Sequence, residues 1–291
     1  MNNTQIELYD TTLRDGMQGE GMSLSADEKL RLAHKLDDLG IDVIEAGFPS
    51  SNPKELELFD LLAREQFKTA QIAAFGMTRR KGTAASEDAA LKVLAECFAP
   101  VATIVGKTWS LHLEKVVQVD RAENLAMIGE SVEFLDAAGK RVIYDAEHFF
   151  DAFEDDREYA LECLRVAASA GASTLALCDT NGATLPGGIA VATAEVVAAL
   201  PDMQIAIHCH NDAELAVARR LRQQLLGLEP LPGRVAVIVQ RVQRHVGCRV
   251  VQKLQRTVQG PQAVRLAESL QVARLEGVGQ VGPCQIGRAH V

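Results

Sequence analysis

Residues 1–218 alternate short apolar runs with longer amphipathic stretches. The runs are rich in Val and Ile and end in Gly or a polar residue, and seven can be counted: Ile6–Tyr9, Val43–Ala46, Gln71–Phe75, Val101–Val105, Arg141–Tyr144, Thr174–Cys178 and Gln204–His208. Near-continuous apolar strands separated by helices are typical of a parallel sheet covered on both faces, because a crossover between parallel strands needs a helix. The pattern predicts an α/β fold.

The expected helices begin and end with recurring signals. Ser25 and Glu28 fit a capping box, and Asn52-Pro53 puts proline at a first helical position, where no N–H is needed. Three expected helices end in glycine shortly before a strand, at Gly40, Gly139 and Gly171. This repeated unit, with no Gly-x-Gly-x-x-Gly turn after the first strand, favours a TIM (β/α)8 barrel over an open doubly wound sheet. Seven strands are visible, so we expect an incomplete barrel.

The composition divides the chain in two. The whole chain has 30 Lys and Arg against 39 Asp and Glu, a net charge of −9. Residues 219–291, however, carry twelve Lys and Arg against three Glu, and they contain no Asp, Phe, Tyr or Trp. We therefore expect residues 1–218 to form the barrel, truncated before strand eight, and residues 219–291 to be a tail outside it.

Other compositional features narrow the class of protein. The net negative charge argues against a nucleic-acid partner. Without a membrane-spanning apolar run or a signal sequence, the protein is expected in the cytoplasm, away from membranes. Six scattered cysteines without a Cys-x-x-Cys pair indicate buried free thiols rather than disulfides or a zinc knuckle.

The carboxyl ends of the expected strands carry metal-binding residue types, and barrel enzymes place their sites at these ends. His208 and His210 are two residues apart, so on a strand they face one side and Cys209 faces the other. Asp15, after the first strand, would complete a set of three ligands for a divalent metal. Mg, Mn and Zn all suit such a set. The alternative is a hydrogen-bonded pair of histidines near a loop.

Further polar residues follow the same strand ends. Arg14 could hold a substrate carboxylate or an oxyanion, or could pair with a barrel carboxylate such as Glu45. Glu147 is a candidate general acid or base, and His148 is its rival, because adjacent strand residues face opposite ways. Thr180 could donate its hydroxyl to a substrate carboxylate.

The segment Arg79-Arg80-Lys81 follows the third strand and admits two interpretations. Three cations at a barrel mouth could bind the phosphates of a nucleotide-bearing cosubstrate. A run of charges is, however, more often a solvated surface.

Several longer motifs point to a family. The segments Asp10–Gln18 and His208–Asp212 resemble the acyl-CoA Claisen-condensing branch of the DRE-TIM metallolyases, which includes 2-isopropylmalate, homocitrate and citramalate synthases. The resemblance is closer to the bacterial (R)-citramalate synthases, through Phe75–Gly82, Gly106–Trp109, Tyr144–Asp151 and Leu177–Pro186. It covers about residues 5 to 218.

The resemblance implies an acyltransferase. It would condense acetyl-CoA with pyruvate and hydrolyse the thioester to (R)-citramalate and CoA, in isoleucine biosynthesis. The alternatives are a 2-isopropylmalate or homocitrate synthase acting on a larger 2-oxo acid, a related lyase that cleaves a 3-hydroxyacyl-CoA, and an inactive fragment of such an enzyme. Members of the family generally form homodimers.

The resemblance also implies a role for each matching residue. The metal would be held by Asp15, His208 and His210. Arg14 would bind the developing alkoxide, Thr180 the pyruvate carboxylate, and Glu147 would take part in proton transfer from the acetyl methyl group. Tyr144 would limit the pocket to the small pyruvate methyl group. The cosubstrate would lie near Gln18, Arg79, Arg80 and Lys81.

The resemblance stops near Arg219. The family continues with a helix and an eighth strand whose Gly- and Asn-containing motif supplies a further metal ligand, and we expect neither here. The change of composition without linker residues, and a final hexapeptide similar to a translated sequencing adapter, indicate that residues 219–291 are translated out of frame. The alternative is a genuine basic tail that binds an acidic partner.

Overall fold

The computed structural model describes residues 7–19, 22–212 and 215 and the backbone of 235–239, all within the first of two units, Met1–Gln243 and Arg244–Val291. The strands are β1 (Glu7–Asp10), β2 (Val43–Gly47), β3 (Gln71–Met77), β4 (Val101–Lys107), β5 (Arg141–Glu147), β6 (Thr174–Asp179), β7 (Gln204–Cys209) and β8 (Val235–Val239). The main helices are α1 (Ala26–Asp38), α2 (Pro53–Leu62), α3 (Ala89–Glu96), α5 (Arg121–Ala137), α6 (Phe149–Asp155), α7 (Arg157–Ser169) and α8 (Pro186–Ala199). The shorter turns are η1 (Asp15–Gln18), η2 (Ala85–Glu87), α4 (Ser110–His112) and η3 (Leu113–Val117).

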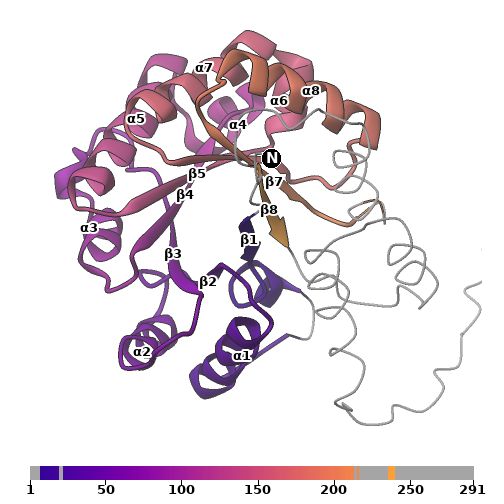
Figure 1. Ribbon diagram of the computed structural model, residues 1–291. Coiled ribbons are helices and arrows are strands. Elements are labelled where there is room, and N and C mark those ends of the chain that lie inside the picture. Colours follow the sequence, from indigo (N-terminus) through magenta and orange to yellow (C-terminus); the bar gives the residue numbers. More distant parts are fainter. Residues whose placement is uncertain (1–6, 20–21, 213–214, 216–234, 240–291) are drawn as a thin grey trace, which may run out of the picture. The chain divides into compact units, whose positions relative to one another are not determined.

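The strands form a closed barrel in which neighbours along the chain pair in parallel, with helices on the outside (Figure 1). All seven strands expected from the sequence are present, and β3, β4 and β5 extend two or three residues beyond the expected ends. The predicted TIM barrel is therefore confirmed. Within the described residues, no helix combines the length and the apolar character needed to cross a bilayer.

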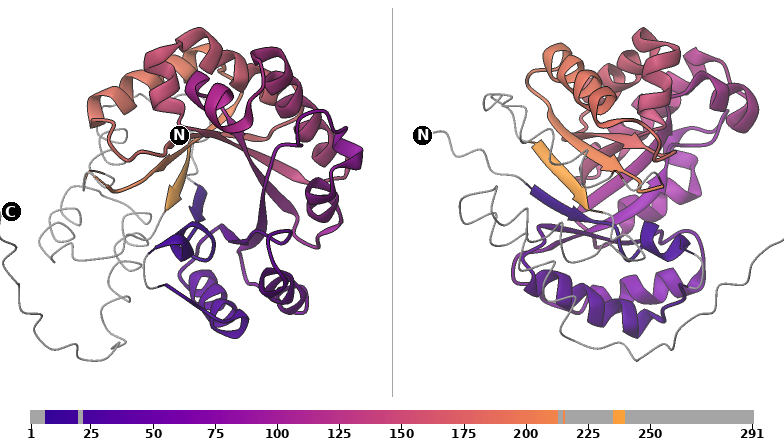
Figure 2. Two further views of the ribbon diagram at one scale, coloured as in Figure 1. Left: turned by 180° about the vertical axis from the view of Figure 1, so that it is seen from behind. Right: turned by 90° about the vertical axis from the view of Figure 1, so that its right-hand side faces the viewer.

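The eighth strand corrects the expectation of a barrel that stops at seven. β8 pairs with β1 through four residues and with β7 through three, and it lies between them (Figure 2). Its sequence, Val-Ala-Val-Ile-Val, is dominated by β-branched residues that favour extended backbone. This run lies inside residues 219–291, the segment whose composition indicates a tail. The rest of residues 219–291 lies outside the described residues.

The predicted helix signals are confirmed. Ser25 Oγ accepts the backbone N–H of Glu28, and the Glu28 carboxylate accepts the N–H of Ser25. Asn52 caps α2 with Pro53 at its first turn. The three helix-ending glycines all have positive φ, the conformation in which a Cβ is strained: Gly40, Gly139 and Gly171.

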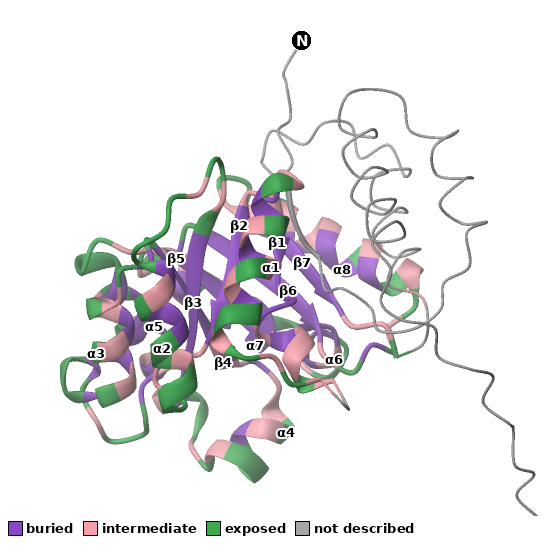
Figure 3. Ribbon diagram, turned by 90° about the horizontal axis from the view of Figure 1, so that it is seen from below, coloured by how far each residue is buried: buried purple, intermediate pink, exposed green. Residues whose placement is uncertain are grey.

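Alternation along the strands produces two separate cores. Leu175 and Leu177 face the helices, whereas Ala176 between them joins an apolar layer inside the barrel. The strands are buried and the outer faces of the helices are exposed (Figure 3). Below the inner layer, Arg141 donates two hydrogen bonds of 2.5 and 2.6 Å to Glu7. An ion pair therefore lies at the amino end of the barrel, and the candidate site residues lie at the carboxyl ends of the strands.

Candidate metal centre at the barrel mouth

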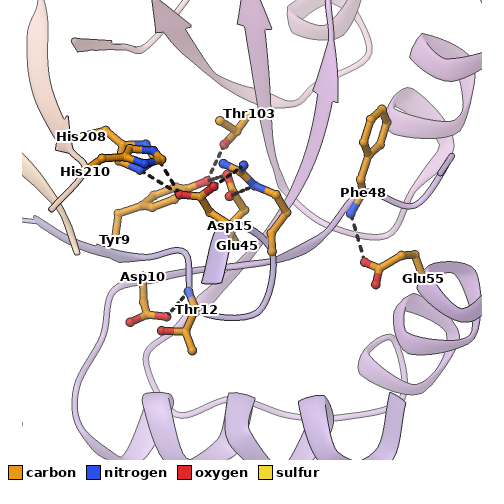
Figure 4. Close-up of polar contacts among 11 residues, drawn as sticks. Tyr9, Asp10, Thr12, Asp15, Glu45, Phe48, Glu55, Thr103, His208 and His210 are labelled. Carbon is orange, nitrogen blue, oxygen red and sulfur yellow. Dashed lines mark hydrogen bonds and ion pairs between the residues drawn. The ribbon is translucent and has the colours of Figure 1, made fainter. Parts of the chain in front are cut away.

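The strand ends bring Asp15, His208 and His210 together, as the sequence predicts. Asp15 begins η1 after β1, and the two histidines come from β7 and the residue just after it. Nε2 of His208 lies 3.3 Å from Oδ2 of Asp15, and Nε2 of His210 lies 3.5 Å from the same oxygen (Figure 4). Their ligand atoms all lie within 4.8 Å of one another. Cys209 faces the helices, as the alternation requires.

The charge states of these groups suit a cation. Burial opposes ionisation of Asp15, but the hydrogen bond with His208 and the positive charge of Arg14 lower the pKa of Asp15 to about 2. Burial, reinforced by neighbouring His208, lowers the pKa of His210 below its ordinary value, which favours the neutral ring. A carboxylate beside imidazoles that can offer lone pairs is a donor set for a divalent metal. The residues present fit the metal that their spacing predicts.

Arg14 is held from three sides. Its Nε donates to Oε1 of Glu45 at 2.5 Å, and its Nη1 lies 3.2 Å from Oδ1 of Asp15. The guanidinium carbon lies 3.8 Å from the ring centroid of Phe75, a cation–π contact. Burial opposes the charge, yet Glu45 and Asp15 raise the pKa of Arg14 above its ordinary value. Arg14 therefore carries a fixed positive charge beside the metal ligands.

Glu45 is itself anchored inside the barrel. Its Oε2 accepts a hydrogen bond of 2.6 Å from the Tyr9 hydroxyl, which also lies 2.7 Å from Oγ1 of Thr103. Glu45 has no exposed surface. The ion pair considered as the structural alternative for Arg14 is therefore present, and it aims the guanidinium toward Asp15.

Glu147 ends β5 and pairs with two residues that the sequence reasoning did not select. Lys107, at the end of β4, donates to Oε2 of Glu147, and Nδ1 of His112 lies 3.8 Å from the same oxygen. Asn124 of α5 donates to the backbone carbonyl of Lys107 at 2.8 Å and so holds the end of β4. Lys107 could have been found from its place at a strand end, the rule that identified Glu147.

Thr180 and His148 are joined by a hydrogen bond. The backbone N–H of His148 donates to Oγ1 of Thr180 at 2.9 Å, which leaves the hydroxyl hydrogen of Thr180 to point elsewhere. His148 has φ of 53° and begins α6, and its Nδ1 lies 3.1 Å from Asp151. The left-handed backbone of His148 ends β5 at Glu147, and the His148 ring packs on that of His112, with 4.4 Å between the ring centroids.

The structure corrects the role expected for Tyr144. Inward and outward positions alternate along β5, so Asp145 and Glu147 face the interior while Tyr144 faces the helices. The Tyr144 ring packs over Gly106, where an added Cβ would come within 2.6 Å of it. Burial, with the neighbouring Cys163 of α7, raises the pKa of the Tyr144 hydroxyl. Tyr144 therefore cannot line a pocket inside the barrel.

The three residues of the basic segment Arg79-Arg80-Lys81 differ in their burial and contacts. Arg79 is buried, and it donates to Glu123 at 2.7 Å and to Glu130 at 2.6 Å. Both partners belong to α5, so Arg79 connects the end of β3 to that helix. Its guanidinium is occupied by these two ion pairs, which corrects the expectation that Arg79 binds phosphate. Arg80 and Lys81 are exposed, as is Gln18 at the end of η1. For these three, cosubstrate binding stays a prediction.

The fold and the three converging donors define a (β/α)8 barrel with a candidate metal centre at its mouth. A family model described as HMGL-like matches residues 5–236, and the chain belongs to this family. That match and β8 both reach beyond residue 218.

Individual relatives agree with the family assignment. The chain is 43% identical over 251 residues to the (R)-citramalate synthase of Aquifex aeolicus, covering 86% of this chain and 48% of that one. It is 42% identical over 236 residues to the (R)-citramalate synthase of Sulfolobus acidocaldarius, covering 81% and 45%. The hydroxymethylglutaryl-CoA lyase of Pseudomonas aeruginosa has a similar fold, with a TM-score of 0.69, 18% identity and 94% coverage of both chains. The chain spans about half the length of the curated relatives it matches.

Proposed function

We propose that this barrel catalyses the condensation of acetyl-CoA with pyruvate, followed by thioester hydrolysis to (R)-citramalate and CoA. The observation that carries the proposal is the meeting of His208 and His210 at one oxygen of Asp15, with Arg14 at the other oxygen of that carboxylate. The citramalate synthases among the relatives support the choice of substrates.

Each residue has a role in this reaction. Asp15, His208 and His210 would hold a divalent cation, Mg, Mn or Zn, whose chemistry is to polarise a keto oxygen as a Lewis acid. Arg14 would place its fixed charge against the oxygen that becomes an alkoxide. Thr180 would donate its hydroxyl to the pyruvate carboxylate, since its oxygen already accepts the N–H of His148.

Glu147 would take the proton from the acetyl methyl group. The resulting carbanion would attack the keto carbon of pyruvate, whose oxygen takes the π electron pair and then a proton from solvent, and water would cleave the thioester to a carboxylate and CoA. Lys107 and His112 hold the Glu147 carboxylate from the side of β4. A base fixed in this way needs little reorganisation at the moment of proton transfer.

The test is release of CoA from acetyl-CoA by the 291-residue chain with Mg²⁺ or Mn²⁺. Pyruvate, 2-oxobutyrate, 3-methyl-2-oxobutanoate and 2-oxoglutarate are compared with a reaction lacking keto acid. We expect release that depends on pyruvate and is lost in Asp15→Asn, while Asp38→Asn, an exposed carboxylate on α1, behaves as the unchanged chain.

Other outcomes would contradict the proposal. Faster release with 3-methyl-2-oxobutanoate or 2-oxoglutarate would indicate a 2-isopropylmalate or homocitrate synthase. Cleavage of a 3-hydroxyacyl-CoA with no condensation would indicate a lyase. Release that is equal without any keto acid would indicate simple thioester hydrolysis.

A further inference from the structure

A second set of metal-ligating side chains lies one layer above the apolar layer of the barrel. Three neighbouring strands contribute Ile143, Ala176 and Ala206 to that apolar layer. Because side chains alternate along a strand, the residues two positions further on face the same interior. These residues are Asp145 on β5, Cys178 on β6 and His208 on β7.

The three side chains are close and buried. Cys178 and His208 are direct partners in the register of β6 and β7. One ligand atom from each of Asp145, Cys178 and His208 lies within 4.8 Å of the others, and each residue is at most 6% exposed. A cation bound to sulfur at about 2.3 Å, and to nitrogen and oxygen at about 2.0 Å, would draw them together by small side-chain rotations.

An unpartnered oxygen of Asp145 is a second, independent indication of a ligand at this position. Oδ1 of Asp145 is buried and has no hydrogen-bond partner among the described residues. A buried oxygen without a hydrogen-bond partner is destabilising. A bound cation would satisfy this oxygen and offset the nearby carboxylates of Glu45 and Asp15.

We propose that Asp145, Cys178 and His208 form a second metal position, selective for thiophilic divalent cations such as Zn²⁺ and Cd²⁺. A thiolate ligand favours these ions over Mg²⁺ and Mn²⁺, which prefer oxygen donors. On binding, the S–H bond of Cys178 breaks, its proton passes to solvent, and the sulfur electron pair goes to the cation. His208 also belongs to the set with Asp15 and His210, so a cation in one position removes a ligand from the other.

The experiment is a Cd²⁺ titration of the full chain, followed by the ultraviolet charge-transfer band between thiolate and cadmium. We expect a saturable band that is reduced by one thiolate in Cys178→Ala. The matched control is Cys163→Ala, another buried cysteine, on α7 and away from the interior carboxylates; it should keep the whole band. Other thiols contribute equally to all three proteins and cancel in the difference.

Two further measurements distinguish the loss of a metal ligand from misfolding of the Cys178→Ala variant. Asp145→Asn keeps the thiol but removes the carboxylate, so its Cd²⁺ affinity should fall at least about tenfold while the band at saturation stays. Mn²⁺ bound beforehand should be released as Cd²⁺ binds, which electron paramagnetic resonance detects. An unchanged band in Cys178→Ala, equal affinity in Asp145→Asn, or retained Mn²⁺ at saturating Cd²⁺ would each overturn the second position. None of these readouts depends on the condensation activity.

Discussion

At the scale of single residues, the site depends on partners that hold the reactive groups. Glu45, Asp15 and the ring of Phe75 fix the guanidinium of Arg14, which in the proposed reaction would face a developing negative charge. Glu45 is in turn fixed by the Tyr9 hydroxyl. Removing a holding partner should therefore affect the reaction rate more than substrate binding.

Glu45→Gln tests this dependence. The change removes the buried partner charge of Arg14 while keeping the size of the side chain, so we expect kcat to fall about 10- to 100-fold with little change in KM. Steady-state kinetics measures the split. Glu65→Gln, at an exposed partner of His34, is the control. A rise in KM with kcat unchanged would show that Glu45 does not orient Arg14 for the chemical step.

Lys107→Met tests the support of Glu147. Without the ammonium, the carboxylate loses its main partner, and we expect slower exchange of the acetyl methyl protons with solvent and a lower kcat. Lys107→Arg should restore part of both rates, because it returns the charge. Lys115→Met removes an exposed lysine of η3 and should change neither rate. Exchange at the normal rate in Lys107→Met would show that Lys107 does not support Glu147 in proton transfer.

Contacts that follow from local alternation along a strand can be predicted from the sequence, whereas contacts between distant segments cannot. The His208 and His210 spacing predicts their shared face because alternation is local. The same rule applied backwards from Glu147 selects Asp145 and excludes Tyr144, which a motif match alone does not do. The partners of Arg79 lie on α5, more than forty residues away. A local run of charges carries no information about such a partner.

At the scale of elements, helix ends are predictable when their signals lie close together in the chain. The capping box at Ser25 and the glycines after α1, α5 and α7 are cases of this kind. The end of α1 also has a long-range partner. Asp37 accepts the backbone N–H groups of Lys68, Thr69 and Ala70 at 2.7 to 2.9 Å, and so joins α1 to the start of β3. Nothing near Asp37 in the sequence indicates this contact.

Asp37→Asn should reveal how much these three hydrogen bonds contribute to the free energy of unfolding. Burial opposes ionisation, but the three backbone donors lower the pKa of Asp37 below its ordinary value. The stabilisation is therefore present above the unfolded pKa of about 4 and is lost as the pH falls through the folded value. We expect the variant to lose about 2 kcal/mol in free energy of unfolding at neutral pH and progressively less below pH of about 4.

Urea unfolding at several pH values measures this difference. Asp38→Asn changes the neighbouring exposed carboxylate, which pairs with Lys68, and should cost less than about 1 kcal/mol. A loss in Asp37→Asn that stays constant down to low pH would mean that the charge of Asp37 is not involved.

At the scale of the whole molecule, closure of the barrel depends on β8. Without it, β1 and β7 would each present an unpaired edge. Val237 is in register with Leu8 on one side and Ile207 on the other. The pattern of residues 1–218 predicts the barrel but not this strand, because the composition of residues 219–291 and their lack of the family motif carry no information about the two strand edges that need a partner.

Val237→Pro tests this closure. Proline removes a backbone N–H from the middle of β8, so we expect about 3 kcal/mol or more of lost stability and a lower melting temperature. Val237→Ala keeps the N–H and serves as the control. Equal melting of the unchanged chain and Val237→Pro would show that β8 does not contribute to the stability of the barrel.

The origin of residues 219–291 stays a prediction, with β8 and the family match to residue 236 both reaching into this segment. The coding nucleotides test it directly. If they are out of frame, a shift of one base near codon 219 restores a helix and a Gly- and Asn-containing motif. If no shift restores them, the basic tail is genuine.

The reaction that we propose for this barrel joins the acetyl methyl carbon to the keto carbon of pyruvate. The direct measurement is a nuclear magnetic resonance experiment with acetyl-CoA labelled with ¹³C in its methyl group, pyruvate, Mn²⁺-free Mg²⁺ buffer and the full chain. We expect the label to move into the methylene group of citramalate as CoA is released. Label that stays in a methyl group, of acetyl-CoA or of acetate, while pyruvate is unchanged would contradict it.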